Sequence, residues 1–319
     1  MKSLDEFKEF SRSTLPGRLY DLEKERRRIL RNVYLAGAAL LVVAGAVSIF
    51  TYFRLGGTGK GDLQIVLLPF FVAAGVLVIL VNLWIRPYKL RFKTQIICEI
   101  VRFVDENLNY EPTGCISEET YMFSELFKTK PSRYKGDDLV TGRIGQTNIQ
   151  FSEIHAEYRS GKHQYTIFKG LFFIADFNKN FRGSTFVLPD VAENLLGRLG
   201  QKLQTLHIGR SDLIKLDDPE FEKYFVVYGD DQIEARYILS PSLMRQIVEF
   251  MQKRRTTVCL SFKKSRVYVA VSYQRDLFEP ALFQTLLNFQ ALQQYFQDLQ
   301  LAIGVVEDLN LNTRIWGKS

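Results

Sequence analysis

The chain has 319 residues, of which 46% are hydrophobic and 24% are charged. This composition is typical of a folded protein and excludes wholesale disorder. Three widely spaced cysteines and three histidines match no disulfide framework and no metal-binding spacing, so we expect no cofactor. The net charge of +7 is concentrated in residues 1–110, with 16 Lys and Arg against 10 Asp and Glu; residues 111–319 have 26 against 25. Since the larger part is almost neutral, we expect no nucleic-acid binding.

The N-terminal segment, residues 1–32, has a helical pattern. Leu4, Phe7 and Phe10 are spaced to lie on one side of a short helix, and Pro16 interrupts it. A charged helix is expected over residues 19–30, and its run of arginines is suited to contact with anionic lipid headgroups.

Two apolar segments follow, residues 33–53 and residues 63–85. They contain 21 and 23 residues without a charge, which is long enough for each to cross a bilayer as a helix. Basic residues flank the pair at one end, whereas the loop over residues 54–62 carries only Arg54 and Lys60. The positive-inside rule therefore predicts an external loop and two cytoplasmic termini.

Small residues are frequent in both apolar segments, as in Ala36–Ala39 and Ala73–Gly75. Such residues allow helices in membranes to approach closely. They favour packing of the two segments against each other, and association with other membrane helices is the alternative.

The rest of the chain predicts a stalk helix over residues 86–110 and one cytoplasmic α+β domain over residues 111–319, with a mainly antiparallel sheet. Residues 149–158 alternate between apolar and polar side chains, with a slip at Ser152–Glu153 that suggests a β-bulge. The other expected elements are a helix starting at Ser117, a turn at 160–162, a strand over 163–177, a helix over 189–206, a strand over 225–228, a helix starting at Ser240–Pro241, a hairpin with its turn at 263–265, and a helix over 280–304.

Three polar residues alternate along one predicted strand and share one face of it, namely Glu153, His155 and Glu157. His163 lies on the predicted partner strand, so a metal site could be assembled here. The spacing matches no established ligand pattern, and a water-exposed sheet face explains these residues equally well.

Asp176 lies in an otherwise apolar strand, where a carboxylate must be exposed, paired or perturbed. Lys169, Lys179 and Arg182 are the partners that we expect.

Asp230, Asp231, Glu234 and Arg236 form a charged cluster before a strand-like stretch. Paired carboxylates can act as general acid and base. The alternative is a turn stabilised by Asp side chains, with Glu234 paired to an arginine.

The expected last helix has apolar residues on more than one side, separated mostly by glutamines. A helix of this kind is buried on several sides or binds a partner.

Several segments together resemble the bacterial domain-of-unknown-function family 3137. They are FKGLFFIADFNKNFRG at 168–183, the segment 217–241, LNLNTRIW at 309–316, and GRIGQTNIQFSEIHAEY at 142–158. The two apolar segments also fit this family. The resemblance implies an uncharacterised bacterial membrane protein with no known catalytic residues, and it suggests a LemA-like membrane protein as a partner.

These observations predict a bacterial inner-membrane protein with a cytoplasmic binding or scaffold domain, in contact with the lipid bilayer and without an assigned catalytic activity. One alternative is a membrane-associated enzyme that acts on a lipid or small ligand. Another is a homo-oligomer assembled through the apolar segments and the last helix.

Overall fold

The computed structural model describes residues 2–55, 62–177, 179–190, 212–254, 256–273, 275–309 and 311. Contacts divide the chain into two compact units. A helical unit combines Lys2–Glu99 with Glu279–Gln294, and a sheet unit combines Ile100–Phe278 with Tyr295–Ser319. The segment 279–294 therefore joins the helical unit although it is far from it in sequence.

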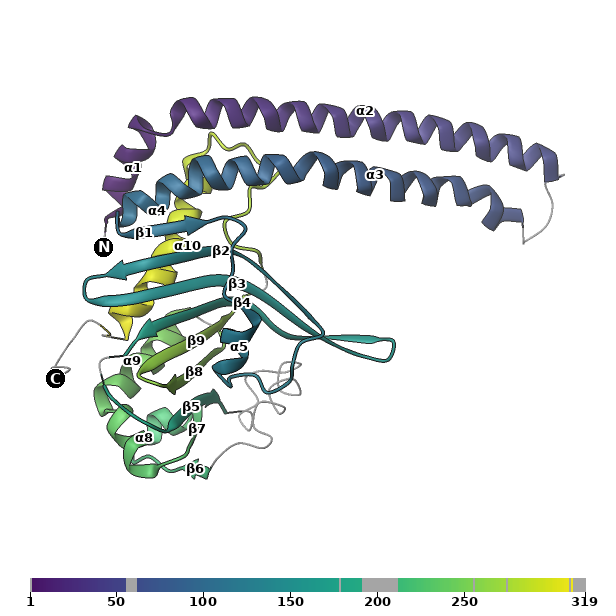
Figure 1. Cartoon of the computed structure of the whole chain (residues 1–319). Helices are drawn as coiled ribbons and strands as arrows, with labels where there is room; N and C mark the ends of the chain where they lie inside the picture. Colours follow the sequence, from purple (N-terminus) through teal and green to yellow (C-terminus); the bar gives the residue numbers. More distant parts are fainter. Residues whose placement is uncertain are drawn as a thin grey trace. The chain divides into compact units, whose positions relative to one another are not determined.

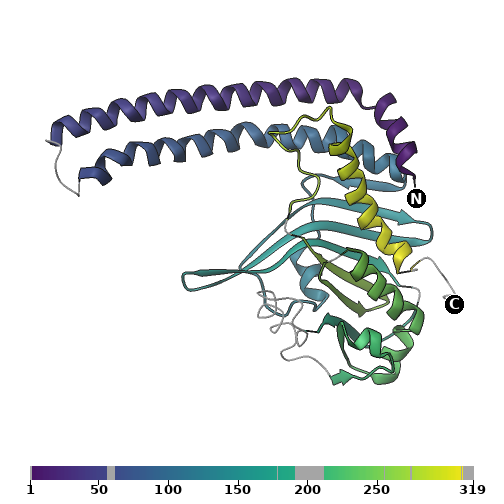
Figure 2. The same ribbon diagram turned by 180° about the vertical axis from the view of Figure 1, so that it is seen from behind.

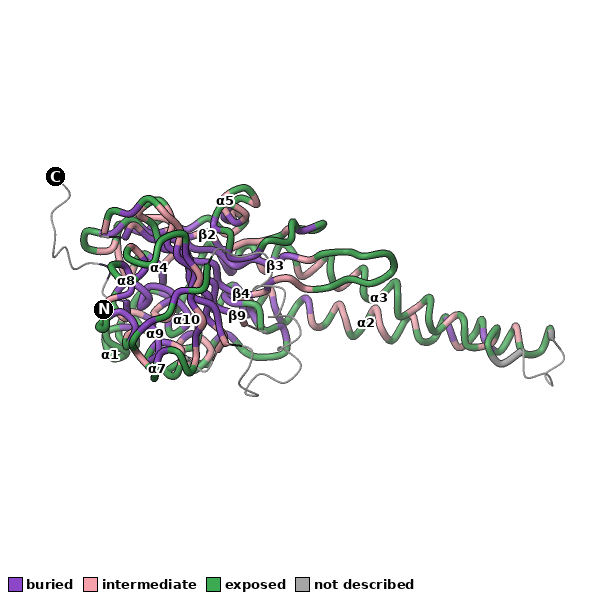
Figure 3. The backbone as a smooth tube through the Cα atoms, turned by 90° about the horizontal axis from the view of Figure 1, so that it is seen from below, coloured by how far each residue is buried: buried purple, intermediate pink, exposed green. Residues whose placement is uncertain are grey.

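Two long helices, α2 (Pro16–Leu55) and α3 (Asp62–Phe92), lie side by side in the helical unit (Figures 1 and 2). They contain the apolar segments 33–53 and 63–85, and both are long and apolar enough to cross a membrane. No residue in the most apolar stretch of the second helix is buried within the structure. Exposed residues line most of both helices in Figure 3. Residues 56–61 of the predicted loop lie outside the described residues.

The short first helix, α1 (Leu4–Ser13), has the predicted position before Pro16. Ser3 and Glu6 form a capping box in which the Glu6 backbone N–H donates to the Ser3 hydroxyl over 3.2 Å. Phe7 is fully buried, and its ring centroid lies 6.0 Å from that of Phe289. The apolar side of α1 therefore packs within the helical unit.

The predicted stalk helix ends earlier than expected. After α3 the chain continues through a π-helical turn, η1 (Lys93–Ile97), into α4 (Cys98–Val104). Asp105 then accepts a hydrogen bond from the backbone of Asn107 over 2.9 Å and turns the chain into a strand. Residues 108–110 are thus part of the sheet and not of the helix, because they pair with a neighbouring strand.

Among the described residues, the sheet unit contains nine antiparallel strands in the order β1-β2-β3-β4-β9-β8-β5-β7-β6. They are β1 (Leu108–Glu111), β2 (Arg133–Ile144), β3 (Thr147–Ser160), β4 (His163–Asp176), β5 (Ser184–Pro189), β6 (Asp212–Ile214), β7 (Phe225–Gly229), β8 (Val258–Lys263) and β9 (Arg266–Ser272). The predicted hairpins β3–β4 and β8–β9 are confirmed, as are the α+β class and the antiparallel sheet.

Helices cover both faces of this sheet. Figure 1 shows α5 (Glu118–Phe123) over one face, and Figure 2 shows α9 (Pro241–Arg254) over the other face, with the part of α10 (Phe289–Asp308) that belongs to the sheet unit. On the α5 side, Tyr121 packs in an aromatic cluster with its ring centroid 5.4 Å from that of Phe172. Two further short helices in the described part of the chain are α7 (Pro219–Glu222) and α8 (Gln232–Ile238). Ser117 caps α5 as predicted.

Because both faces are covered, the centre of β3 does not alternate in burial, and residues 151–154 are all buried. An irregularity occurs where the sequence predicts a bulge, but the extra residue belongs to β2. Asp138 and Leu139 of β2 lie opposite the single residue Ser152 of β3. Cys259 is buried in the α5-side cluster for the same reason.

The last helix begins at Phe289 and not at Pro280. Asn288 accepts a hydrogen bond from the Gln290 backbone over 3.0 Å and so caps the first turn. In the preceding irregular segment the Phe283 side chain is 75% exposed. The predicted helix over 189–206 lies largely outside the described residues.

Candidate functional site

The predicted polar set on β3 separates into two parts. Glu153 is buried and accepts a hydrogen bond from the Leu277 backbone N–H over 2.8 Å. His155 and Glu157 form their own contact, with Nε2 and Oε1 3.4 Å apart, and Glu157 also pairs with Arg133 over 3.4 Å. His163 is at the end of the hairpin, opposite Ser160. The four residues therefore do not form the metal site that could be drawn from the sequence.

Asp176 is paired, but not with the residues that the sequence suggests. Its Oδ2 accepts from the Asn148 amide over 2.7 Å, and its Oδ1 lies 3.8 Å from Nε of Arg266, its cross-strand neighbour. Lys169 instead pairs with Asp276, with Nζ and Oδ1 2.7 Å apart. Asp176 thus has a structural explanation within the sheet.

The cluster at residues 230–236 lies at the start of helix α8 and not before a strand. Asp231 is the N-cap and accepts from the backbone of Ile233 over 2.7 Å and of Glu234 over 3.0 Å. Arg236 donates to the carbonyl of Lys215 over 3.3 Å. These contacts are local and structural, as in the turn interpretation of this cluster.

Asp230 and Glu234 hold the turn before β5. The carboxylate of Glu234 accepts from the backbone N–H groups of Arg182 and Gly183, each over 2.7 Å. Asp230 accepts from the next one, at Ser184, over 2.8 Å. Three successive backbone donors are therefore satisfied by two carboxylates. Among the described residues Glu234 forms no ion pair with an arginine, so the expected arginine pairing is wrong.

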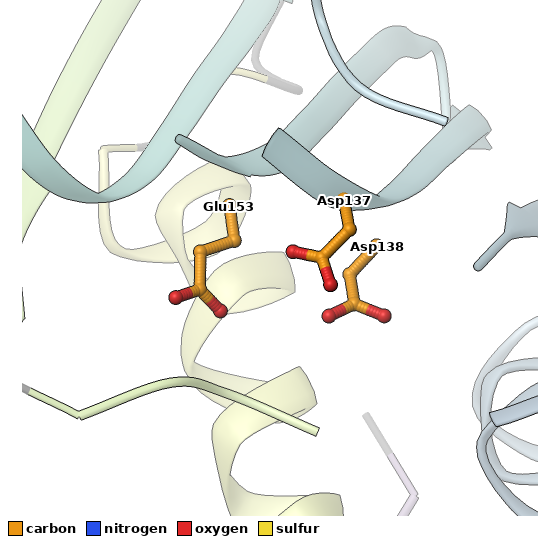
Figure 4. Close-up of side chains that lie close together, drawn as sticks. All are labelled: Asp137, Asp138 and Glu153. Carbon is orange, nitrogen blue, oxygen red and sulfur yellow. The ribbon is translucent and has the colours of Figure 1, made fainter. Parts of the chain in front are cut away.

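The strand register creates an acidic cluster that the sequence does not reveal. Among the described residues, Asp137, Asp138 and Glu153 offer carboxylate oxygens that all lie within 4.8 Å of one another (Figure 4). Asp137 is the cross-strand neighbour of Glu153, and Asp138 is in the bulge with φ of 58°. Oxygen ligands at this separation suit a divalent cation, and carboxyl groups so close can also share a proton.

Close packing explains why glycine precedes the two aspartates. A Cβ atom added at Gly136 would lie 2.4 Å from the carbonyl oxygen of Glu153 and 2.7 Å from Cβ of Cys115. A larger residue would force β2 away from β3 at the bulge. Burial in this region, with a smaller contribution from Asp137, also raises the pKa of the Cys115 thiol.

The electrostatics of the cluster favour a neutral Glu153. Burial, against the hydrogen bond from Leu277 and with smaller contributions from the nearby Asp137, Asp276 and Asp138, raises the pKa of Glu153 to about 8. The Tyr110 hydroxyl donates to Oδ1 of Asp138. Protein groups therefore already bind the carboxyl groups of Asp138 and Glu153, and protonation of Glu153 relieves the repulsion among the carboxyl groups without a cation.

Sequence reasoning found Glu153 but missed Asp137 and Asp138. Two consecutive acidic residues normally point to opposite faces of a strand, so their convergence on one site depends on the bulge. Asp tolerates positive φ better than most residues, which makes the Gly-Asp-Asp sequence at 136–138 the available signal.

The sequence profile described as "Protein of unknown function (DUF3137)" matches residues 166–311. The chain resembles the DUF3137 family. The matched segment contains most of β4, all of β5 to β9, and α10. Asp137, Asp138 and Glu153 lie outside the DUF3137 match, as do the two long helices.

A solved structure is also similar, the crystal structure of the mycobacterial trehalose monomycolate transport factor A, TtfA. The identity is 11% and the TM-score is 0.34, over 68% of this chain and 96% of that chain. None of the curated proteins compared matches this DUF3137-like chain.

Proposed function

We propose that this chain is a bacterial inner-membrane protein in which α2 and α3 form a transmembrane hairpin and the sheet unit is a cytoplasmic binding or scaffold domain. The main support is the exposed apolar surface of the two helices. Phe53, Phe71 and Val42 are 77%, 73% and 72% exposed. Burying such surface in lipid is favourable by about 25 cal/mol per Å², whereas leaving it in water is not.

The basic flanks support the proposed orientation. Arg26, Arg27, Arg28 and Arg31 precede the first apolar segment, and four further basic residues follow the second at the same end of the helix pair. An excess of Lys and Arg marks the cytoplasmic end of membrane helices.

The structural contacts of the polar residues singled out in the sequence favour a binding role over catalysis. Asp230, Asp231 and Glu234 accept backbone hydrogen bonds, and Asp176 is bound by Asn148. These groups stabilise turns and strands, so an enzyme acting on a lipid or small ligand would need other residues.

A partner with its own membrane helices fits the small residues of the hairpin. Gly37 lies against Leu77 of the other helix, since an added Cβ would be 3.7 Å from Cδ2 of Leu77. An added Cβ at Gly45 or Gly75 would meet no described atom within 4 Å. These two positions leave room for close approach of a helix from a LemA-like protein or from a second copy of this chain.

The orientation is tested with reporter fusions in bacterial cells. A phosphatase that is active only outside the cytoplasm should be active when inserted in the loop at 56–61 and inactive at the C-terminus. A fluorescent protein that folds only in the cytoplasm should give the opposite result. Activity of the C-terminal phosphatase fusion would overturn the proposed topology.

The scaffold role is tested by native purification of the full-length protein in mild detergent, with mass determination and identification of what is retained. A stoichiometric membrane protein supports the scaffold proposal, and a multiple of the chain mass supports self-assembly. A monomer that retains only a small molecule would contradict both and favour the enzyme alternative.

A further inference from the structure

A groove of about 1040 Å³ lies between α2 and α3, at the basic end of the apolar segments. All its lining residues belong to the helical unit. Its polar wall includes Lys24, Arg28 and Arg31 of α2 and Arg91 of α3. The groove is therefore built by two helices and not by one basic stretch alone.

Positive charge dominates this groove. Five cationic side chains line it, four from α2 and Arg91, against the two carboxylates of Asp21 and Glu25. Glu25 pairs with Arg91 over 3.2 Å, and the fifth cation, Arg27, pairs with the neighbouring Glu23 over 2.9 Å.

Three of these cations are available for a ligand. Lys24, Arg28 and Arg31 are exposed and have no ion-pair partner within the part of the chain that the structure describes. Their charges are one turn apart on one helix, so they repel one another unless an anion lies between them.

The groove lies at the ends of the apolar segments, and this position favours a lipid headgroup as the anion. Asn32 and Leu83, which line it, are next to the start of the first apolar segment and near the end of the second. Trp84 is half-buried in the same wall. Tryptophan at the end of an apolar segment is typical of the depth at which lipid headgroups lie.

We propose that this groove binds the headgroup of an anionic phospholipid, with its phosphate beside Arg28 and Arg31 of α2. This inference rests on the proposed transmembrane hairpin. The acyl chains would lie along the exposed apolar surface of α2 and α3. Guanidinium groups bind phosphate oxygens through paired, charge-assisted hydrogen bonds, which distinguishes a site from general attraction to a negative membrane.

The test measures lipid binding to the full-length protein in neutral detergent by native mass spectrometry, with phosphatidylglycerol and phosphatidylcholine as probes. We expect one phosphatidylglycerol to bind at least about tenfold more tightly than phosphatidylcholine, as charge-assisted hydrogen bonds predict. Equal binding of the two lipids would overturn the proposal.

Two single substitutions provide a matched comparison. Arg28→Gln in the groove should weaken phosphatidylglycerol binding about tenfold, whereas Arg86→Gln should change it less than about twofold. Arg86 is exposed at the same end of the hairpin but does not line the groove. Equal losses from the two variants would show diffuse electrostatic attraction and contradict a defined site.

Two further measurements separate the remaining outcomes. Inorganic phosphate at millimolar concentration should not displace the lipid, and displacement would assign the groove to a soluble anion instead. Alkaline carbonate extraction of bacterial membranes that contain the full-length protein tests the transmembrane hairpin itself. Release by carbonate would overturn the proposed function, whereas retention together with unselective lipid binding would overturn only this inference.

Discussion

Glu23 and Arg26 form a buried ion pair near the beginning of α2. Nη2 of Arg26 lies 2.7 Å from Oε1 of Glu23, and the two side chains are 9% and 3% exposed. Arg26 also donates to the carbonyl of Leu282 over 2.7 Å, and Glu23 accepts from the backbone of Leu286 over 3.2 Å. The pair therefore fixes the segment 279–294 within the helical unit.

We expect Glu23→Gln to destabilise the helical unit by about 3 kcal/mol, because it leaves the Arg26 charge buried without its counter-ion. Asp21→Asn, at an exposed position two residues earlier, is the control and should have almost no effect. Thermal unfolding and hydrogen exchange of the Leu286 amide in detergent would measure both. Equal behaviour of the two variants would contradict the assigned role.

The same pair predicts an acid dependence. Hydrogen bonding from Arg26 holds the pKa of Glu23 at about 2, below its ordinary value of 4.5. Because this pKa is lowered in the folded state, ionised Glu23 stabilises the folded protein above pH 4.5. That stabilisation is lost as the pH falls towards 2. Glu23→Gln should therefore remove part of the stability loss over this range, as followed by thermal unfolding at several pH values.

Glu153 should show the opposite dependence. Its pKa of about 8, raised mainly by burial, means that the folded state retains a proton that the unfolded chain releases near pH 4.5. Stability from this group is therefore complete below pH 4.5 and falls as the pH rises to about 8.

We expect Glu153→Gln to abolish this fall and to stabilise the protein at pH 8.5 by on the order of 3 kcal/mol, because the amide has the shape of the neutral acid. Glu119→Gln, at an exposed position in α5, is the control. Thermal unfolding between pH 5 and 8.5 gives the comparison. A variant whose stability still declines with pH like the native protein would show that Glu153 is ionised when folded.

At the scale of the elements, the contact between β4 and β9 depends on Gly170. Its φ is +150°, and an added Cβ would lie 2.1 Å from the carbonyl oxygen of Val271. The oxygen belongs to the backbone and cannot turn aside as a side chain could, so the strands would have to separate.

Gly170→Ala should therefore cost about 3 kcal/mol or more. Gly161 is the matched control, because it also has positive φ, +59°, but an added Cβ meets nothing within 4 Å. We expect Gly161→Ala to cost only about 1 kcal/mol. The thermal midpoints of the two variants measure these costs. Similar midpoints would show that β4 and β9 can separate without a large loss of stability.

Elements with local signals were predictable. The turns of β3–β4 and β8–β9 follow from sequence, as do the caps at Ser117 and Ser240. Where a distant partner decides, prediction failed. Leu108 and Tyr110 continue an apolar helical pattern but instead pair with β2.

At the scale of the whole molecule, we expect the full-length protein to remain folded without a divalent cation. Tyr110 and Leu277 already hydrogen-bond two carboxyl groups of the acidic cluster, and Glu153 retains a proton at neutral pH. A chelator should shift the thermal midpoint by less than about 1 °C. A larger drop in the thermal midpoint would contradict this expectation. If Mg²⁺ or Ca²⁺ reversed that drop, and if the Asp137→Asn variant did not show it, the cluster would be established as a cation site.

The candidate site was only partly predictable. Alternation along β3 identified Glu153 as a residue of interest, but its partners depend on register. Asp137 and Asp138 reach it because β2 contains one extra residue opposite Ser152. A shift of one residue in register would place these side chains on the other face.

The sequence by itself determined the two long apolar helices, their basic flanks, the antiparallel hairpins and the α+β class. Each depends on composition or on contacts between residues close in the chain. Only the tertiary structure decided that β5 lies between β7 and β8, that three carboxyl groups converge at a bulge, and that residues 279–294 join the helical unit. Those features depend on packing between distant segments, which no local pattern encodes.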